Sequence, residues 1–438
     1  METFLIKALQ LVFSLSILVI VHEFGHFLFA RLFKIRVDKF YLFFDPWFAL
    51  FRHKPKNSET EYGIGWLPLG GYVKIAGMID ESMDKEQLAQ PPQPWEFRTK
   101  PAWQRLLVMV AGVIFNLILA FFIYAMVVFH WGDSYFEPKN GNIGMDFSET
   151  AERAGFVDGD VIFLVDGKAA IDRGGIIDNL PSQIITAKTV TVLRDGEKVE
   201  VRIPEDLPQQ LMRDKKGFGS YIVPTIVSEV IKDREAGRIG LQKGDSLVAV
   251  NGVPTPTFDV FTNELGKNRS REIEVSYYRG GVLHTATAQL DSTATLGFYP
   301  DFHQTTVHYS LLQSFPEGIK YGLRTLKGYI AQFKFVFTKE GASSLGGFGT
   351  IGNFFPPKWN WYAFWTMTAF LSVILAFMNI LPIPGLDGGH VLFLLYEVVS
   401  GRKPSDKFLE HAQIAGMVLL FGLLFYANGM DIIRAIFK

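Results

Sequence analysis

The chain has 438 residues, a length that predicts two to four domains. Hydrophobic residues make up 48% of it and the mean hydropathy is +0.18, which indicates several membrane spans together with soluble mass. The formal net charge of -1, without a basic stripe, excludes an obvious nucleic-acid partner, and the absence of cysteine excludes disulfides and thiolate metal sites. A metal ion would therefore be bound by histidine and carboxylate side chains.

The first expected membrane span covers residues 4–33 and carries three ionisable side chains in an apolar run. His22 and His26 are four residues apart, which on a helix places both imidazoles on one face, within reach of a single Zn²⁺. Glu23 lies beside them, where a carboxylate acts as general base in a zinc hydrolase. Ionisable groups inside a span are costly and mostly functional. The alternative is a structural histidine pair with Glu23 extended towards the membrane surface.

Lysine and arginine recur between Arg31 and Arg105, so the positive-inside rule predicts a cytoplasmic loop there. His22 precedes Arg31 by nine residues, which is roughly 14 Å of helix. The metal-binding motif is therefore expected inside the bilayer, nearer its cytoplasmic side.

Residues 62–78 combine glycine and proline with β-branched and aromatic residues, a pattern that predicts a β-hairpin. Two roles are open for it. One is an ordinary hairpin packed on the membrane face. The other is a strand edge, with Gly70 and Gly71, that dips towards the active site and holds an extended peptide by β-addition. Residues 80–94 are expected to form a flexible polar connector.

The second expected span covers residues 103–131. Gly112 and Asn116 lie four residues apart on one helix face, which indicates close helix packing followed by a polar side chain that needs a partner inside the bundle. A structural role is the simpler interpretation, and Asn116 is also a candidate substrate contact.

Residues 132–304 are mixed in polarity, rich in β-formers and lack a spanning segment. Residues 155–167 (GFVDGDVIFLVDG) align with residues 240–252 (GLQKGDSLVAVNG) at an offset of 85 residues, about the size of one small domain. Each copy predicts a turn, a Gly-Asp pair, a buried strand and a hairpin turn. Both copies resemble PDZ domains, which bind peptide termini by β-augmentation. The predicted topology places the pair outside the cytoplasm.

The C-terminal part begins with an amphipathic segment, 309–339, and a glycine-rich segment, 340–355, both expected on the outer membrane surface. A third span, 361–380, runs into Asn379-Ile-Leu-Pro382-Ile-Pro384-Gly-Leu-Asp387-Gly-Gly-His390. Two prolines two residues apart break a regular helix, and a broken helix at membrane depth is tolerated where it lines a cavity or is buried in protein. A further apolar run follows, and the last span is expected at 414–437.

A catalytic zinc site needs a third protein ligand. Asp387 is the preferred candidate because it is the acid in the broken segment. Asp45 is the rival by distance along the chain, since many soluble enzymes with this motif take their third ligand from shortly downstream. His390 is expected to face the next helix instead.

These features together resemble the site-2 intramembrane zinc metalloproteases, in the branch with two PDZ domains. The resemblance rests on the HEFGH motif, the glycine-rich hairpin, Gly112 with Asn116, the two PDZ-like copies and the segment from Asn379. It implies His22, His26 and Asp387 as ligands of one catalytic Zn²⁺, Glu23 as catalytic base and Asn379 as a substrate contact. The family often has Gly-Pro where this chain has Gly112-Val113 and Gly347-Phe348.

The fold class implied is a polytopic α-helical membrane protein with about four transmembrane helices, a membrane-reentrant β-hairpin and two extracytoplasmic PDZ-like α+β domains. The expected organisation is 1–130 for two helices, the cytoplasmic loop and the hairpin, 131–222 and 223–304 for the PDZ-like domains, 305–360 for the membrane-surface segment and 361–438 for the last two helices.

The resemblance implies a protease of the bacterial inner membrane that cleaves transmembrane segments of single-span proteins, such as anti-sigma factors and signal-peptide remnants. The PDZ pair, in the periplasm, would act as a size filter, and the enzyme is expected to be a monomer. A non-proteolytic zinc-containing scaffold is the competing function, and the intact Glu23 argues against it. A metal-dependent transporter is disfavoured because the polar groups cluster at one site rather than forming a path.

Overall fold

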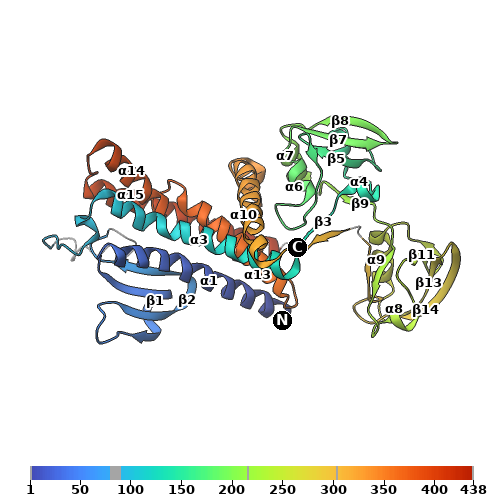
Figure 1. Ribbon diagram of the computed structural model, residues 1–438, viewed down its shortest axis with the longest axis horizontal. Coiled ribbons are helices and arrows are strands. Elements are labelled where there is room, and N and C mark those ends of the chain that lie inside the picture. Colours follow the sequence, from blue (N-terminus) through green and yellow to red (C-terminus); the bar gives the residue numbers. More distant parts are fainter. Residues whose placement is uncertain (1, 79–89, 215–216, 302–303, 437–438) are drawn as a thin grey trace. The chain divides into compact units, whose positions relative to one another are not determined.

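The structure, a computed structural model, describes residues 2–78, 90–214, 217–301 and 304–436 (Figure 1). The chain forms two compact units. The first contains residues 1–132, 308–330 and 343–438, and the second contains residues 133–307 and 331–342. Most of the polar connector expected at 80–94 lies outside the described residues.

Among the described residues, four helices are long and apolar enough to cross a membrane. They are α1 (Glu2–Leu32), α3 (Ala102–Trp131), α13 (Trp361–Ile380) and α15 (Asp406–Ile436). Each of the four predicted spans falls on one of these helices, with one shifted start. Helix α15 begins at Asp406 instead of near Ile414, because polar residues before the apolar run continue the helix. A shorter helix, α14 (Asp387–Ser400), follows the predicted break.

Helices α1, α3 and α13 lie side by side in the first unit (Figure 1). Gly25 lets α1 approach α3 closely, since a Cβ there would lie 2.7 Å from the Ala111 carbonyl oxygen. The Ser372 hydroxyl of α13 donates to the Asn116 carbonyl of α3 at 2.7 Å. The three helices therefore enclose a common interior in which polar groups of different helices meet.

The loop after α1 forms two long, bent strands, β1 (Val37–His53) and β2 (Glu61–Ile75). Phe40 of β1 pairs with both Tyr62 and Val73 of β2, and its neighbours repeat this double pairing. The first half of β1 therefore lies between the two ends of β2. The predicted hairpin within 62–78 is wrong in this respect, because its arms pair with β1 and not with each other. A short 3₁₀ helix, η1 (Phe97–Thr99), precedes α3.

The predicted amphipathic segment forms α10 (Leu311–Phe333). Gly318 brings α10 against α3, since a Cβ there would lie 2.4 Å from the Ala125 nitrogen, and the rings of Tyr321 and Tyr124 stack at 4.3 Å. Three short helices follow, η2 (Lys334–Phe337), α11 (Lys339–Ser344) and α12 (Phe348–Asn353). The expected position of these segments on the outer membrane surface stays a prediction.

The second unit contains two lobes. Lobe 1 consists of α4 (Pro138–Gly141), β4 (Met145–Phe147), α5 (Glu149–Arg153), β5 (Val161–Val165), β6 (Lys168–Ala169), α6 (Leu180–Ile184), β7 (Thr189–Arg194), β8 (Glu197–Arg202), α7 (Leu207–Asp214) and β9 (Gly219–Tyr221). Lobe 2 consists of β10 (Val227–Val230), α8 (Glu235–Arg238), β11 (Ser246–Val250), β12 (Val253–Pro254), α9 (Phe258–Lys267), β13 (Glu272–Arg279), β14 (Val282–Gln289) and β15 (Phe298–Pro300). Strands β3 (Asp133–Tyr135) and β16 (Thr305–Val307) pair with each other outside the lobes.

The two lobes share strand order and internal bonds. The four-stranded sheets have the orders β6-β5-β7-β8 and β12-β11-β13-β14, and each lobe adds one two-stranded sheet. Asp160 in lobe 1 accepts two hydrogen bonds from Arg194, at 2.8 and 2.7 Å, and Asp245 accepts the same two from Arg279 in lobe 2, also at 2.8 and 2.7 Å. Each lobe has its own apolar core. Their assignment as PDZ domains stays a prediction.

Candidate metal centre

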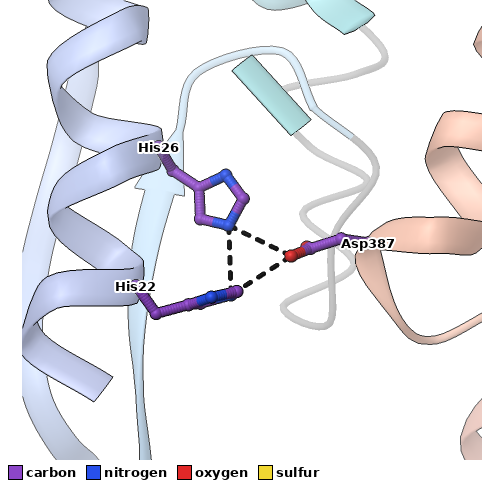
Figure 2. Close-up of side chains that lie close together, drawn as sticks. All are labelled: His22, His26 and Asp387. Atoms are coloured by element: carbon purple, nitrogen blue, oxygen red, sulfur yellow. Dashed lines mark hydrogen bonds and ion pairs between the residues drawn. The ribbon is translucent and has the colours of Figure 1, made fainter. Parts of the chain in front are cut away.

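Helix α1 presents the two histidines on one face, as their spacing predicts. Both are buried, with exposed fractions of 7% for His22 and 6% for His26. Their Nε2 atoms are 3.2 Å apart, and Figure 2 shows both rings facing the carboxylate of Asp387. The two imidazoles therefore converge on one point inside the first unit.

Asp387 reaches this point because the chain turns sharply between α13 and α14. It is the first residue of α14, directly after the turn that contains Pro382 and Pro384. A Cβ at Gly388 would lie 2.0 Å from the Leu381 carbonyl oxygen, and one at Gly389 would lie 2.7 Å from the Pro384 Cα. The two glycines after Asp387 are therefore needed for the turn to fold back against the start of α14.

The three side chains fit a zinc ion. Asp387 Oδ2 lies 3.1 Å from His22 Nε2 and 3.3 Å from His26 Nε2. Ligand atoms at about 2.0–2.1 Å from a tetrahedral zinc ion are about 3.3 Å from one another, which matches this triangle. Asp387 Oδ2 is buried and has no hydrogen-bond partner among the described residues. A cation would satisfy the converging lone pairs, and three protein ligands leave one position for water or substrate.

Helix α3 orients both imidazole rings. His26 Nδ1–H donates to the Val108 carbonyl oxygen at 2.8 Å, which leaves Nε2 as the lone-pair atom of the neutral ring. His22 Nδ1 lies 3.1 Å from Asn116 Nδ2, and the Asn116 side-chain oxygen has no hydrogen-bond partner among the described residues. Rotation of the amide by 180° would place this oxygen against His22, where it accepts from Nδ1–H and leaves Nε2 free for a metal.

Gly112 provides the space that the two rings occupy. A Cβ at this position would lie 2.4 Å from His26 Nε2 and 2.7 Å from His22 Cε1. Any side chain on this face of α3 would therefore displace the ligand atoms. The sequence predicted close packing at Gly112, and the structure shows that the atoms packed there are the histidine rings.

Glu23 lies on the side of α1 that faces the sheet, near the backbone of Val73 in β2. Gly71 allows this approach, because a Cβ there would lie 2.6 Å from the Val19 side chain of α1. Gly70, the residue before Gly71 in β2, has φ of +156°, and a Cβ there would lie 2.9 Å from the Phe44 ring. The edge of β2 is therefore held beside the predicted catalytic carboxylate.

Asn379, at the end of α13, places its amide nitrogen 3.3 Å from His22 Nε2. The two rival ligands lie elsewhere. Asp45 accepts a hydrogen bond from the Tyr72 hydroxyl at 2.8 Å within the sheet. His390 lines a hollow of about 100 Å³ with Phe97 and other residues, and neither rival belongs to the cluster of potential ligands.

Sequence reasoning missed two backbone groups of this site. The Val108 carbonyl and the Val73 amide contact His26 and Glu23, and no residue type marks such contacts in a sequence. Asn116 was detectable as a polar residue in a span, but it is fully buried against His22. This contact favours a ring-orienting role over the predicted substrate contact.

Comparison with known proteins assigns the chain to a protein family. The sequence profile described as peptidase family M50 matches residues 10–423. The chain belongs to peptidase family M50. This is the site-2 protease family that the sequence motifs resembled, so the chain is an intramembrane zinc metalloprotease.

Similar proteins come from several bacteria. The regulator of sigma-E protease RseP of Escherichia coli K12 is 28% identical, over 99% of this chain and 100% of its own length. The protein of the same name in Salmonella typhimurium strain 14028s is 27% identical, over 97% of both chains. A Rickettsia conorii protein whose name includes "zinc metalloprotease" is 28% identical, over 98% of this chain and 99% of its own length. One catalytic zinc ion is consistent with these names.

Proposed function

We propose that this M50 protease hydrolyses peptide bonds within the transmembrane segments of single-span proteins, with His22, His26 and Asp387 as zinc ligands and Glu23 as catalytic base. The observation that carries the proposal is the convergence of three ligand atoms, 3.1–3.3 Å apart, beside a carboxylate inside a bundle of apolar helices. Ionisable groups at membrane depth mostly mark functional sites.

Zinc, when bound, would lower the pKa of a water molecule and polarise the scissile carbonyl group. The Glu23 carboxylate takes the proton from this water and returns it to the leaving amine. The Asn379 amide, beside His22 Nε2, donates to the substrate backbone or to the oxygen that becomes negative during the attack. Asn116 and the Val108 carbonyl hold the imidazole rings in the ligating orientation.

A substrate helix must unwind before cleavage, because its backbone groups are otherwise bonded to each other. The edge of β2 around Gly70 and Gly71 is well placed to hold an unwound segment as an added strand. The tip of β1 supports a membrane position for the sheet, since the side chains of Trp47, Leu50 and Phe51 are 89%, 68% and 56% exposed. We therefore propose that the sheet enters the bilayer from the cytoplasmic side.

The second unit is proposed to be periplasmic. Its two lobes are proposed to be PDZ domains that exclude substrates with a bulky ectodomain. Anti-sigma factors trimmed by another protease and signal-peptide remnants are the proposed substrates, by analogy with the relatives named as regulators of sigma-E. The enzyme is proposed to reside in the bacterial inner membrane and to act as a monomer.

The deciding experiment measures cleavage of a tagged single-span substrate in membranes, with and without its ectodomain. Glu23→Gln should reduce cleavage by roughly 10²–10⁴-fold while zinc content is retained. The truncated substrate should be cleaved faster than the full-length one by the wild-type enzyme. Equal cleavage by both enzymes would remove Glu23 from the mechanism and favour the scaffold function. Equal cleavage of both substrates by the wild-type enzyme would exclude the size filter but would leave the role of Glu23 unaffected.

A further inference from the structure

Helix α15 buries little of its surface against the rest of the first unit. It is the least buried of the four long helices, with 11% of its most apolar window buried against 22–44% in the others. Within the described part of α15, only Gln413 and Gly416 are buried. They lie three residues apart on one helix face, and Gln413 is 5% exposed. A buried glutamine on a helix surrounded by lipid requires a specific polar partner.

The partner is the turn between α13 and α14. The Gly385 N–H donates to Gln413 Oε1 at 3.2 Å. Gly416 packs directly on the backbone of Pro384, the residue before Gly385, since a Cβ at Gly416 would be 1.6 Å from the Pro384 carbonyl oxygen. Gly385 has φ of +93°, and a Cβ there would lie 3.0 Å from the Leu420 side chain. Helix α15 therefore holds this turn by one hydrogen bond and by backbone contact.

The turn carries Asp387 two residues after Gly385. Internal hydrogen bonds make it stiff, with the Leu386 N–H donating to the Ile383 carbonyl at 3.1 Å and the Gly389 N–H donating to the Leu386 carbonyl at 3.0 Å. A shift of Gly385 would therefore be transmitted to the Asp387 carboxylate. Without Gln413, the partly buried Gly385 N–H would lose its partner, and an unpaired backbone group is costly in the apolar interior of a membrane.

We infer that Gln413 and Gly416 are positioning residues for the metal centre, because they fix the turn that places the Asp387 carboxylate opposite His22 and His26. The inference rests on the proposed role of Asp387 as a zinc ligand. It makes α15 part of the support of the site, although no side chain in the described part of α15 belongs to the ligand cluster. Residues that hold metal ligands commonly change metal affinity by 10–100-fold when mutated.

The test measures zinc affinity of the purified full-length protein by competition with a chelator, together with the absorption spectrum of the cobalt-substituted protein. Gln413→Met keeps the side-chain length but removes the acceptor, and should weaken zinc binding by roughly tenfold or more and alter the cobalt bands. Gln413→Glu keeps an acceptor oxygen and should restore most of the affinity. Val418→Ala, on the exposed side of the same helix, is the matched control.

Gly416→Ala should displace the turn that carries Asp387 without removing the Gln413 acceptor. It should therefore also weaken zinc binding. Wild-type affinity and an unchanged cobalt spectrum in Gln413→Met and in Gly416→Ala would overturn the inference. Asp387→Asn separates this outcome from failure of the proposed ligand set. If Asp387→Asn binds zinc normally, the ligand assignment is wrong. If only Asp387→Asn loses zinc, the assignment stands and the role of α15 is rejected.

Discussion

The ring of His22 is held from two helices at once, through Asn116 of α3 and Asn379 of α13. The two contacts fall on different ring atoms. Asn116 faces Nδ1, whose proton decides which nitrogen is free, whereas Asn379 lies beside Nε2, the atom that faces Asp387. A side chain at position 116 therefore controls the tautomer of a ligand without touching the substrate.

Substitutions of Asn116 should show this control. Asn116→Leu removes the acceptor for the His22 Nδ1–H, and should lower both zinc affinity and kcat/KM by roughly tenfold. Asn116→Asp keeps an acceptor oxygen and should retain more of both. Chelator competition and cleavage of a membrane-embedded substrate measure the two quantities. If the leucine and aspartate variants behave alike, Asn116 does not orient His22.

A single methyl group added at Gly112 should weaken zinc binding more than it disturbs the packing of the helices. In Gly112→Ala the new Cβ would clash with His26 Nε2 and with the His22 ring, so we expect zinc affinity to fall by at least roughly tenfold and cleavage to be lost. Gly422→Ala is a matched control, because a Cβ on that α15 glycine meets no atom within 4 Å. Normal zinc binding by Gly112→Ala, measured beside this control, would contradict the close approach of α3 to the rings.

At the scale of elements, the two similar lobes make it possible to measure how much one buried ion pair contributes to the stability of a small domain. Asp245 is 1% exposed, and its bonds come from Arg279 and from the Gln242 N–H. Burial by itself raises the pKa of the Asp245 carboxyl, but these bonds outweigh burial and hold the pKa below its usual value. The pair therefore stabilises lobe 2 only while the carboxylate is ionised.

The stability of lobe 2 should depend on this pair and on pH. Arg279→Met leaves the buried carboxylate without its main partner and should lower the free energy of unfolding at neutral pH. In the wild type, the same stabilisation is complete above the unfolded-state pKa of about 3.9 and is lost as pH falls through the lower folded-state pKa. Hydrogen exchange of peptides from β11 and β13, corrected for intrinsic rates, measures both effects.

Lobe 1 serves as the internal control for this experiment, since its Arg194–Asp160 pair is untouched by the substitution. Exchange in β5 and β7 should stay at the wild-type rate in Arg279→Met. The prediction fails if lobe 2 exchanges as slowly in the variant as in the wild type at neutral pH.

Local patterns predicted the long helices well, and pairing between segments poorly. The bounds of α13 agree with the sequence prediction, because an apolar run between Asn360 and Leu381 determines them locally. The hairpin at 62–78 was wrong because the pairing partner of a strand depends on distant residues, here those of β1. The proposed ligand set could be named from the sequence because each of its members is an ionisable residue in an apolar segment. The contacts of Val108, Val73 and Gln413 require the three-dimensional structure.

At the scale of the whole molecule, the metal centre joins segments from both ends of the chain. His22 and His26 come from the first span, and Asp387 follows the third. Removal of zinc should therefore abolish proteolysis and loosen α14 relative to α1, because the ligand lone pairs then repel each other. The lobes should be unaffected, since each has its own core.

Chelation of the purified enzyme tests this expectation. Cleavage of a single-span substrate should stop after treatment with a chelator and return on addition of zinc. Hydrogen exchange should increase in α14 and stay constant in β5 and β11. Full activity in protein shown to be free of metal would reject metal-dependent catalysis.

Because Asp387 lies near the end of the chain, the metal centre is completed late in protein synthesis. The ribosome makes the first span, with its histidines and Glu23, long before the turn that carries Asp387, the proposed third ligand. During most of translation the nascent chain therefore exposes an incomplete site to the bilayer and to neighbouring membrane proteins. Hydrolysis can begin only after α14 has been made and has docked on α1 and α3. A protease assembled in this way is inactive towards its surroundings until its own membrane insertion is nearly finished.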